Sequence, residues 1–327
     1  YQSGHNFLQA LENQRNSGEA GKKMTTLQTR STIEPFLWSE AQWSYAAAKV
    51  VVLPIPYEAT TTYRKGCQHG PDAILNASQQ LECYDEELDW EVAQEVGIYT
   101  AEPIADTRHE AVSAETMLQA TQDAIVRLHQ DGKFVISLGG EHSITAGIVE
   151  GYRQLYPNEP FTVVQIDAHG DLRHEYEGSI HNHACVMRRI VEMGLPTVQI
   201  GIRSICKEES ELIKANNLTV FRAREIANQT DWIDRAVASI PTQKVFITID
   251  LDGLDPTLIP GVGTPEPGGL NWYSLLTFLR QVIQTHEVIG CDVMELAPVQ
   301  DSVVSEFTAA KLIYKLVGYQ AIAQKWK

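Results

Sequence analysis

Short apolar runs with many β-branched residues recur along the chain, and longer amphipathic stretches lie between them. Their length and composition are typical of strands, and apolar residues at successive positions suit a sheet that is covered on both faces. Seven such runs predict strands of one sheet, at Val50–Leu53, Phe134–Leu138, Phe161–Ile166, Val198–Ile202, Leu218–Phe221, Val245–Ile249 and Val288–Val293.

Several of the intervening stretches have apolar residues three and four positions apart, which is typical of helices. The clearest are Ala111–Leu128, Ser143–Leu155, Tyr273–Ile283 and Thr308–Ile322. Because strand and helix alternate, we predict an α/β fold, a three-layer α/β/α sandwich around a mostly parallel sheet. Ligands in such folds bind beyond the carboxyl ends of the strands.

One domain is expected over residues 24–327, because no linker-like stretch rich in Gly, Ser, Pro or charge interrupts this part of the chain. Residues 1–23 are polar, rich in Gln, Asn, Gly and Glu, and precede the first methionine. We predict a disordered extension or an expression remnant there. The spacing of Phe7, Leu8 and Leu11 also suits a short helix.

The composition of the chain limits the cellular environments and the binding partners that are expected for the protein. No apolar run approaches the roughly 20 residues that span a bilayer, and no basic start leads into an apolar stretch, so we expect a cytoplasmic protein without membrane contact. The five cysteines form no CxxC pair, which disfavours a disulfide framework or a thiolate zinc site. The formal charge of −16 opposes nucleic-acid binding and suits a small cationic ligand.

The first motif with possible chemistry is GGEHS at residues 139–143, directly after the predicted strand Phe134–Leu138. Its two glycines permit a sharp turn, and Ser143 is expected to cap the next helix. His142 then stands at the tip of the strand. A lone histidine at such a position is more often structural or solvated than functional.

The second motif is DAHGD at residues 167–171, after the strand Phe161–Ile166. In an extended chain, the period of two aims Asp167, His169 and Asp171 to the same side. The alternative is a turn with capping aspartates. Three potential ligands on one face directly after an apolar strand favour a metal site.

The third motif is DLDGLDP at residues 250–256, after the strand Val245–Ile249. Asp250 and Asp252 share one face, where their repulsion raises their pKa values or destabilises the fold unless a cation lies between them. An exposed acidic turn is the alternative. Asp255 precedes a proline and is expected to be a turn residue.

Together the three strand ends supply six potential ligands, namely His142, Asp167, His169, Asp171, Asp250 and Asp252. This set exceeds the four ligands of a zinc site and is too rich in carboxylates for a thiophilic metal. It suits two divalent ions about 3.5–4 Å apart, with Mn²⁺ as the first choice and Ni²⁺ as an alternative. Two such ions activate water near neutral pH, and no Ser-His-Asp group or Walker loop competes, so the site predicts hydrolysis.

The three motifs resemble the metal-binding motifs of the ureohydrolase family, which contains the arginases and agmatinases. The resemblance extends over about residues 51–322 and includes Gly263–Leu270 and Met294–Pro298. It implies an arginase-like fold, two Mn²⁺ per subunit and a homotrimer or homohexamer. It also implies that a hydroxide bridging the ions attacks the guanidinium carbon, which releases urea and an amine.

The resemblance further implies a role for each ligand. Two aspartates bridge the ions and one His–Asp pair completes each coordination sphere: Asp167 and Asp250 bridge, His142 pairs with Asp171, and His169 pairs with Asp252. Besides Asp171, two residues are expected to act in catalysis. Glu295 matches the glutamate that holds the guanidinium through paired hydrogen bonds, and His183 matches the histidine that delivers a proton to the leaving amine. His174 and His181 are close neighbours of His183, and a merely polar loop is the alternative.

Substrate choice depends on residues 172–179, which resemble the agmatinase segment and lack the small polar residues that receive the carboxylate in arginases. Glu175 and Glu177 are expected to attract the terminal ammonium of agmatine. Arg173 either turns inward toward a carboxylate or pairs with a surface glutamate. We therefore predict that agmatine is hydrolysed to putrescine and urea, with guanidine, guanidinobutyrate or arginine as alternative substrates.

Two rival functions compete with this interpretation. A metal-dependent deacetylase of related fold needs one metal and different ligands. A non-catalytic relative that acts as a binding or regulatory subunit would typically have lost a ligand. Here all six ligand positions are filled, which favours the enzyme.

Overall fold

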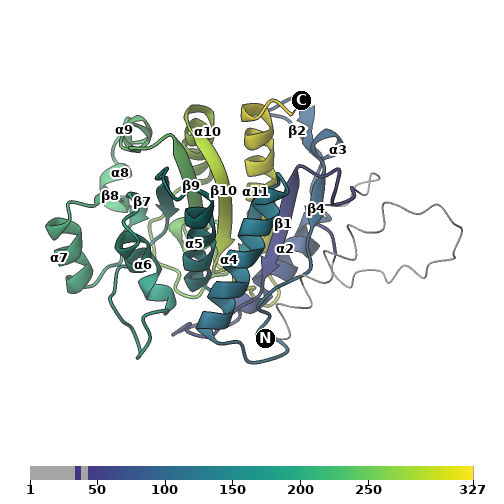
Figure 1. Ribbon diagram of the computed structural model, residues 1–327. Coiled ribbons are helices and arrows are strands. Elements are labelled where there is room, and N and C mark those ends of the chain that lie inside the picture. Colours follow the sequence, from purple (N-terminus) through teal and green to yellow (C-terminus); the bar gives the residue numbers. More distant parts are fainter. Residues whose placement is uncertain (1–33, 38–42, 327) are drawn as a thin grey trace, which may run out of the picture.

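Eight parallel strands form the central sheet of the structure, a computed structural model that describes residues 34–37 and 43–326 (Figure 1). Their order across the sheet is β4-β1-β5-β10-β9-β6-β7-β8. Their bounds are β1 Val50–Ile55, β4 Ile98–Thr100, β5 Phe134–Gly139, β6 Thr162–Ile166, β7 Thr197–Ile202, β8 Thr219–Arg222, β9 Lys244–Asp250 and β10 Glu287–Met294. The seven predicted strands are confirmed, with ends that differ by at most two residues.

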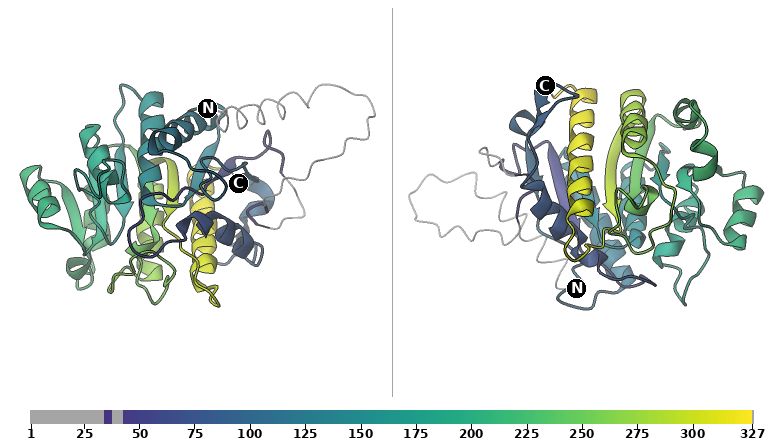
Figure 2. Two further views of the ribbon diagram at one scale, coloured as in Figure 1. Left: turned by 90° about the horizontal axis from the view of Figure 1, so that it is seen from below. Right: turned by 180° about the vertical axis from the view of Figure 1, so that it is seen from behind.

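Helices cover both faces of this sheet (Figure 2). One face carries α2 (Gly70–Ser78), α9 (Trp232–Ala238), α10 (Trp272–Thr285) and α11 (Val304–Ala323). The other face carries α4 (Ala114–Gln130), α5 (Thr145–Leu155), α6 (Val186–Glu192) and α7 (Lys207–Ala215). Shorter elements include the β2–β3 hairpin (Tyr84–Asp85 and Trp90–Glu91), α3 (Val92–Val96) and α8 (Ala223–Ile226). The predicted three-layer α/β/α sandwich is confirmed.

Strand β1 shows why uninterrupted apolar runs indicated the sheet. Val50 and Val52 belong to the core beneath one helix layer, whereas Val51 and Leu53 belong to the core beneath the other. Successive side chains of a strand point to opposite faces, and here both faces are buried. Every position along the strand is therefore apolar.

The four predicted helices are present, but three details at their starts were wrong. The helix predicted from Thr308 begins earlier, at Val304. The helix predicted from Ala111 begins at Ala114, where the Ser113 side chain accepts a hydrogen bond from the Thr116 amide (3.2 Å). Ser143 does not cap α5, because its hydroxyl donates to the carboxylate of Glu141 (2.6 Å). Helices α2, α6, α7 and α9 have only seven to nine residues each, too few for a clear periodic pattern.

Within the part of the chain that the structure describes, no helix is long and apolar enough to cross a membrane. All five cysteines are free thiols. The predicted extension at residues 1–23 lies outside the described residues. The single domain and the cytoplasmic location stay predictions.

Candidate metal centre

Three of four neighbouring strands bring the predicted ligands to one edge of the sheet. β5, β10, β9 and β6 lie side by side and run parallel, so their carboxyl ends share that edge. The turn η3 (His142–Ile144) follows β5, residues 167–171 follow β6, and the turn η5 (Leu251–Gly253) follows β9. Segments that are far apart in the sequence therefore meet at one place.

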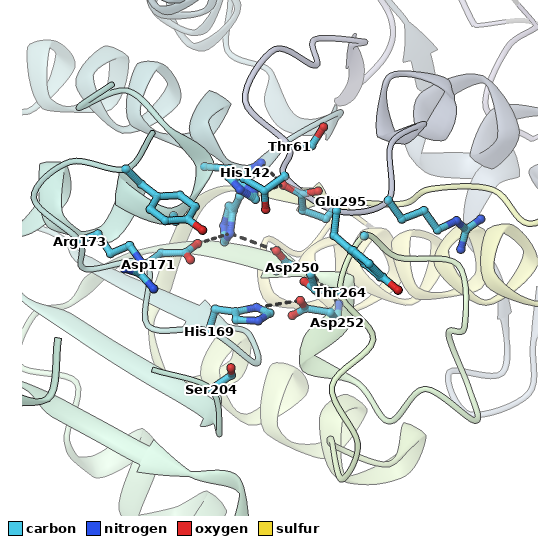
Figure 3. A pocket seen from close by; sticks show the side chains of 17 residues that line it. Thr61, His142, His169, Asp171, Arg173, Ser204, Asp250, Asp252, Thr264 and Glu295 are labelled. Carbon is cyan, nitrogen blue, oxygen red and sulfur yellow. Dashed lines mark hydrogen bonds and ion pairs between the residues drawn. The ribbon is translucent and has the colours of Figure 1, made fainter. Parts of the chain in front are cut away.

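All six predicted ligands come together there (Figure 3 shows five of them). His142 Nδ1 lies 3.1 Å from Asp167 Oδ2, 3.2 Å from Asp171 Oδ2 and 3.3 Å from Asp250 Oδ2. His169 Nδ1 lies 2.9 Å from Asp252 Oδ2 and 3.6 Å from Asp167 Oδ1. Two groups able to hold a metal ion result, His142–Asp167–Asp250 and Asp167–His169–Asp252. They share Asp167, so the residues fit a pair of ions with a common carboxylate.

The backbone at the cluster bends more than the sequence pattern implied. The chain does not continue straight from β6 through residues 167–171, since it bends at Ala168 and Asp171 has a φ of 51°. Glu295, after β10, has a φ of 66°. Residues other than glycine rarely adopt this left-handed backbone conformation, and such strain is typical of functional sites. After this bend, Asp171 Oδ2 lies 3.2 Å from His142 Nδ1.

Burial concentrates charge in the cluster. Burial raises the pKa of Asp250 well above its usual range, and the charges of Asp252 and Asp167 raise it further. Burial alone lowers the pKa of His142, but its hydrogen bonds to the surrounding aspartates, Asp167 first, hold that pKa well above its usual range. Protons on the imidazoles thus balance the carboxylates when no metal is bound. Divalent ions would have to displace these protons, so we expect metal binding to strengthen as pH rises.

A network of buried hydroxyl groups orients the His142 side chain through hydrogen bonds. His142 Nε2 lies 2.8 Å from Thr248 Oγ1, which lies 3.3 Å from Thr145 Oγ1. Thr145 Oγ1 donates to Asp292 Oδ2 (2.8 Å), and all four side chains are buried. With the Nε2 proton engaged by Thr248, the Nδ1 lone pair remains for a metal. Sequence reasoning missed this support, because these strand and helix positions look like ordinary core sites.

Replacing Thr248 by Val keeps the shape of the side chain and leaves the Nε2 proton of His142 without its acceptor. We expect the affinity for the first Mn²⁺ to fall by about 10- to 100-fold, the usual effect of losing such a partner. Calorimetric titration of metal-free protein with Mn²⁺ measures this change. Thr248→Ser, which keeps the hydroxyl, is expected to bind as the wild type does; equal affinities for the Val variant and the wild type would contradict the assigned support.

A cavity of about 240 Å³ opens onto the cluster, and its lining includes His183 and Glu295. This volume lies just below the range of about 300–1,000 Å³ that is usual for small-molecule sites. Of the three loop histidines, His183 alone lines the cavity. Asp167 lies beneath the lining, fully buried.

Glu295 connects the cavity with both histidines. Its Oε1 accepts a hydrogen bond from the His142 amide (2.8 Å) and lies 3.5 Å from His183 Nδ1. Burial alone lowers the pKa of His183, but the hydrogen bond and charge of Glu295 raise it to about 9. His183 Nε2 is buried without a hydrogen-bond partner among the described residues. In the absence of metal ions, whose charge opposes protonation, the imidazole of His183 is therefore protonated on both nitrogens and positively charged at neutral pH.

The structure does not bring all the predicted substrate residues into the cavity. Glu175 and Glu177 are exposed and do not line it. Arg173 does line it, which agrees with the predicted inward orientation, and its guanidinium lies over the Tyr176 ring at 4.5 Å. Tyr176, between the two glutamates, takes their place in the wall.

Sequence reasoning also missed part of the wall. The missed lining residues are Thr61, Thr62, Tyr63 and Arg64 from the loop after β1, with Ser204. Gly263 and Thr264, which the sequence analysis named without a role, also line the cavity. Arg64 is fixed in place, since it donates to the backbone oxygens of Ala297 and Pro298. The loop after β1 carries no metal-ligand motif. Its contribution to the cavity wall follows only from the position of β1 beside β5 in the sheet.

The parallel sheet, the paired candidate ligand groups at its carboxyl edge and the cavity beside them fit a hydrolase of α/β/α architecture with a site for two metal ions. Residues 48–318 match the model of the arginase family. The chain belongs to that family. It is accordingly a ureohydrolase, a hydrolase of guanidino C–N bonds, and the family assignment removes the deacetylase alternative.

Similar proteins support the same conclusion. The N(1)-aminopropylagmatine ureohydrolase of Synechocystis sp. is 60% identical over 89% of this chain and 95% of its own length. The agmatinase of Pyrococcus horikoshii is 36% identical over 84% of this chain and 93% of its own. Among solved structures, the agmatine ureohydrolase of Thermoplasma volcanium superposes with a TM-score of 0.80 at 30% identity, covering 91% of this chain and 98% of that one.

Proposed function

We propose that this protein hydrolyses the guanidinium group of N(1)-aminopropylagmatine and releases urea and the corresponding triamine, aminopropylputrescine. The observation that carries the proposal is the high identity, over nearly the full length, to the Synechocystis enzyme of that name. Agmatine, the substrate predicted from residues 172–179, is the second candidate. Its support is the similarity to the agmatinases.

The cavity suits a cationic guanidino compound. Among the described residues that line it, the carboxylates are Asp171, Asp250, Asp252 and Glu295. In our proposal the first three hold metal, which leaves Glu295 to receive the planar guanidinium through paired, charge-assisted hydrogen bonds. Tyr63 and Tyr176 also line the cavity and offer aromatic faces to an ammonium on the substrate tail.

His183 supplies the proton in this proposal. Its Nε2 has no protein partner among the described residues and is available to the leaving amine, while its Nδ1 side faces Glu295. A neutral amine leaves far more readily than an amide anion, so a positioned acid accelerates this step. A pair of divalent ions on the six ligands supplies Lewis-acid stabilisation and activates water for attack. We propose Mn²⁺ for both positions, because the ligand set is rich in carboxylates.

The decisive test compares urea release from N(1)-aminopropylagmatine, agmatine, arginine, guanidinobutyrate and guanidine. The protein is loaded separately with Mn²⁺, Ni²⁺ and Zn²⁺. We expect kcat/KM for N(1)-aminopropylagmatine to exceed that for agmatine by at least about tenfold, the value of one additional favourable polar contact. A higher kcat/KM for agmatine would make agmatine the substrate. No urea from any of the five compounds, with two ions bound, would contradict both candidates.

The assembly of the subunits belongs to the same proposal. We propose a homotrimer or homohexamer, as the family resemblance implies. Light scattering on the purified protein measures the mass directly, and a monomer at assay concentration would contradict this part without affecting the chemistry.

A further inference from the structure

Glu141 is a fully buried carboxylate that neither the metal cluster nor the proposed chemistry uses. Burying a charge costs several kcal/mol unless hydrogen bonds compensate it. Four donors surround this one. Its Oε2 accepts from the amides of Ala59 and Thr60 (2.6 Å each), and its Oε1 accepts from the hydroxyls of Thr60 (2.7 Å) and Ser143 (2.6 Å).

The contact with Thr60 extends to the proposed proton donor. Thr60 Oγ1 accepts a hydrogen bond from the backbone amide of His183 (2.9 Å). Because the Thr60 proton is committed to Glu141, the hydroxyl presents its lone pairs to that amide. The orientation of one hydroxyl is therefore fixed from both sides.

These contacts close a ring of interactions, three of whose members, His142, His183 and Glu295, line the cavity. Glu141 leads through Thr60 to His183, whose Nδ1 lies 3.5 Å from Glu295 Oε1. The same oxygen accepts from the amide of His142, the residue next to Glu141. The ring joins the loop after β1, the turn after β5, the turn η4 (His183–Cys185) and the segment after β10. Figure 3 shows His142 and Glu295 side by side, with the Thr61 loop above them.

We propose that Glu141 and Thr60 are positioning residues that hold the imidazole of His183 at the substrate. The inference rests on the proposed role of His183 as proton donor. Glu141 acts at two removes from the substrate, through Thr60 and then through the backbone of His183. The same two residues anchor the start of the loop whose next residues, Thr61–Arg64, form the cavity wall.

The test uses the metal-loaded protein with Thr60→Val, which removes the hydroxyl at nearly constant volume, and Thr60→Ser, which keeps it. We expect kcat of the Val variant to fall by about 10- to 100-fold, the cost of misplacing a catalytic group by about 1 Å. KM and the bound metal are expected to stay within twofold of the wild type. The solvent deuterium isotope effect on kcat should rise, because proton delivery becomes slower, and Thr60→Ser should restore kcat to within about threefold.

A matched control is Thr162→Val. Thr162 is also buried and its hydroxyl pairs with Thr242 (2.7 Å), but it lies at the amino end of β6, away from the cavity. We expect its kcat to match that of the wild type. If Thr60→Val fails to fold, the isosteric Glu141→Gln replaces it, because its amide donates where Thr60 needs an acceptor.

Three outcomes would overturn the inference. They are a folded Thr60→Val or Glu141→Gln variant with wild-type kcat, a loss of turnover that Thr60→Ser does not restore, and a loss accompanied by loss of metal, which would place the effect on His142. Failure of the proposed function has a different signature, because the wild type itself, with two ions bound, would then release no urea from any of the five compounds. If only the proposed role of His183 fails, His183→Asn would retain wild-type urea release, whatever the variants of Thr60 do.

Discussion

Replacing Asp167 by Asn is expected to lower urea release by at least about 10³-fold, because one ion of the pair loses its place. Asp167 belongs to both ligand groups, with Oδ2 toward His142 and Oδ1 toward His169. A carboxamide has one oxygen and no charge, so it cannot serve two cations. Loss of a Lewis acid worth several kcal/mol corresponds to this drop in rate.

The measurement pairs initial rates with metal analysis by mass spectrometry after dialysis. We expect the Asp167→Asn protein to retain fewer than two ions per chain. Asp255→Asn is the control, since Asp255 belongs to the same strand-end motif as the ligand Asp250 but serves the turn, where it accepts from Thr257 (3.0 Å). It should keep both ions and most activity. Two ions and normal turnover in the variant of Asp167 would contradict its bridging role.

Replacing Glu295 by Gln is expected to lower kcat/KM by about 10²- to 10³-fold while leaving both metal ions bound. The carboxylate is the proposed partner of the guanidinium, and removing one charge of a buried, hydrogen-bonded pair costs about 2–5 kcal/mol. The carbonyl oxygen of Gln still accepts from the His142 amide, so the metal side is preserved.

Steady-state kinetics and metal content, measured on the same preparation, test this expectation. Glu287→Gln is the control, because Glu287 is exposed at the opposite end of the same strand, β10, where it pairs with Lys244 (2.8 Å). The control should behave as the wild type does. A Glu295→Gln protein with unchanged kcat/KM would remove this residue from substrate binding.

Much of the fold and the ligand set was accessible from the sequence for physical reasons. A strand buried on both faces must be apolar throughout, so the long strands were evident, and the six predicted ligands lie at or just after the ends of three of them. The three-residue edge strand β4 and the short helices gave no comparable pattern. These elements depend on tertiary packing.

The contacts that support His142 and His183, and the residues proposed to contact the substrate tail, could not be predicted from the sequence in the same way. Thr248 and Thr60 act through hydrogen bonds to residues 106 and 123 positions away, which no local pattern encodes. The expectation for Glu175 and Glu177 rested on charge alone. The backbone between them turns Tyr176 to the cavity and leaves the glutamates in solvent, a choice that charge does not predict.

The last strand of the chain, β10, lies between β5 and β9 in the middle of the sheet. During synthesis the site therefore cannot form in stages, because the position between β5 and β9 in the sheet is not filled until residues 287–294 have emerged from the ribosome. Closing so long a loop is slow, and it delays the site to the end of folding. We expect metal uptake by the nascent chain to require the emergence of β10, and truncation just before β10 should abolish it although all six predicted ligands are present.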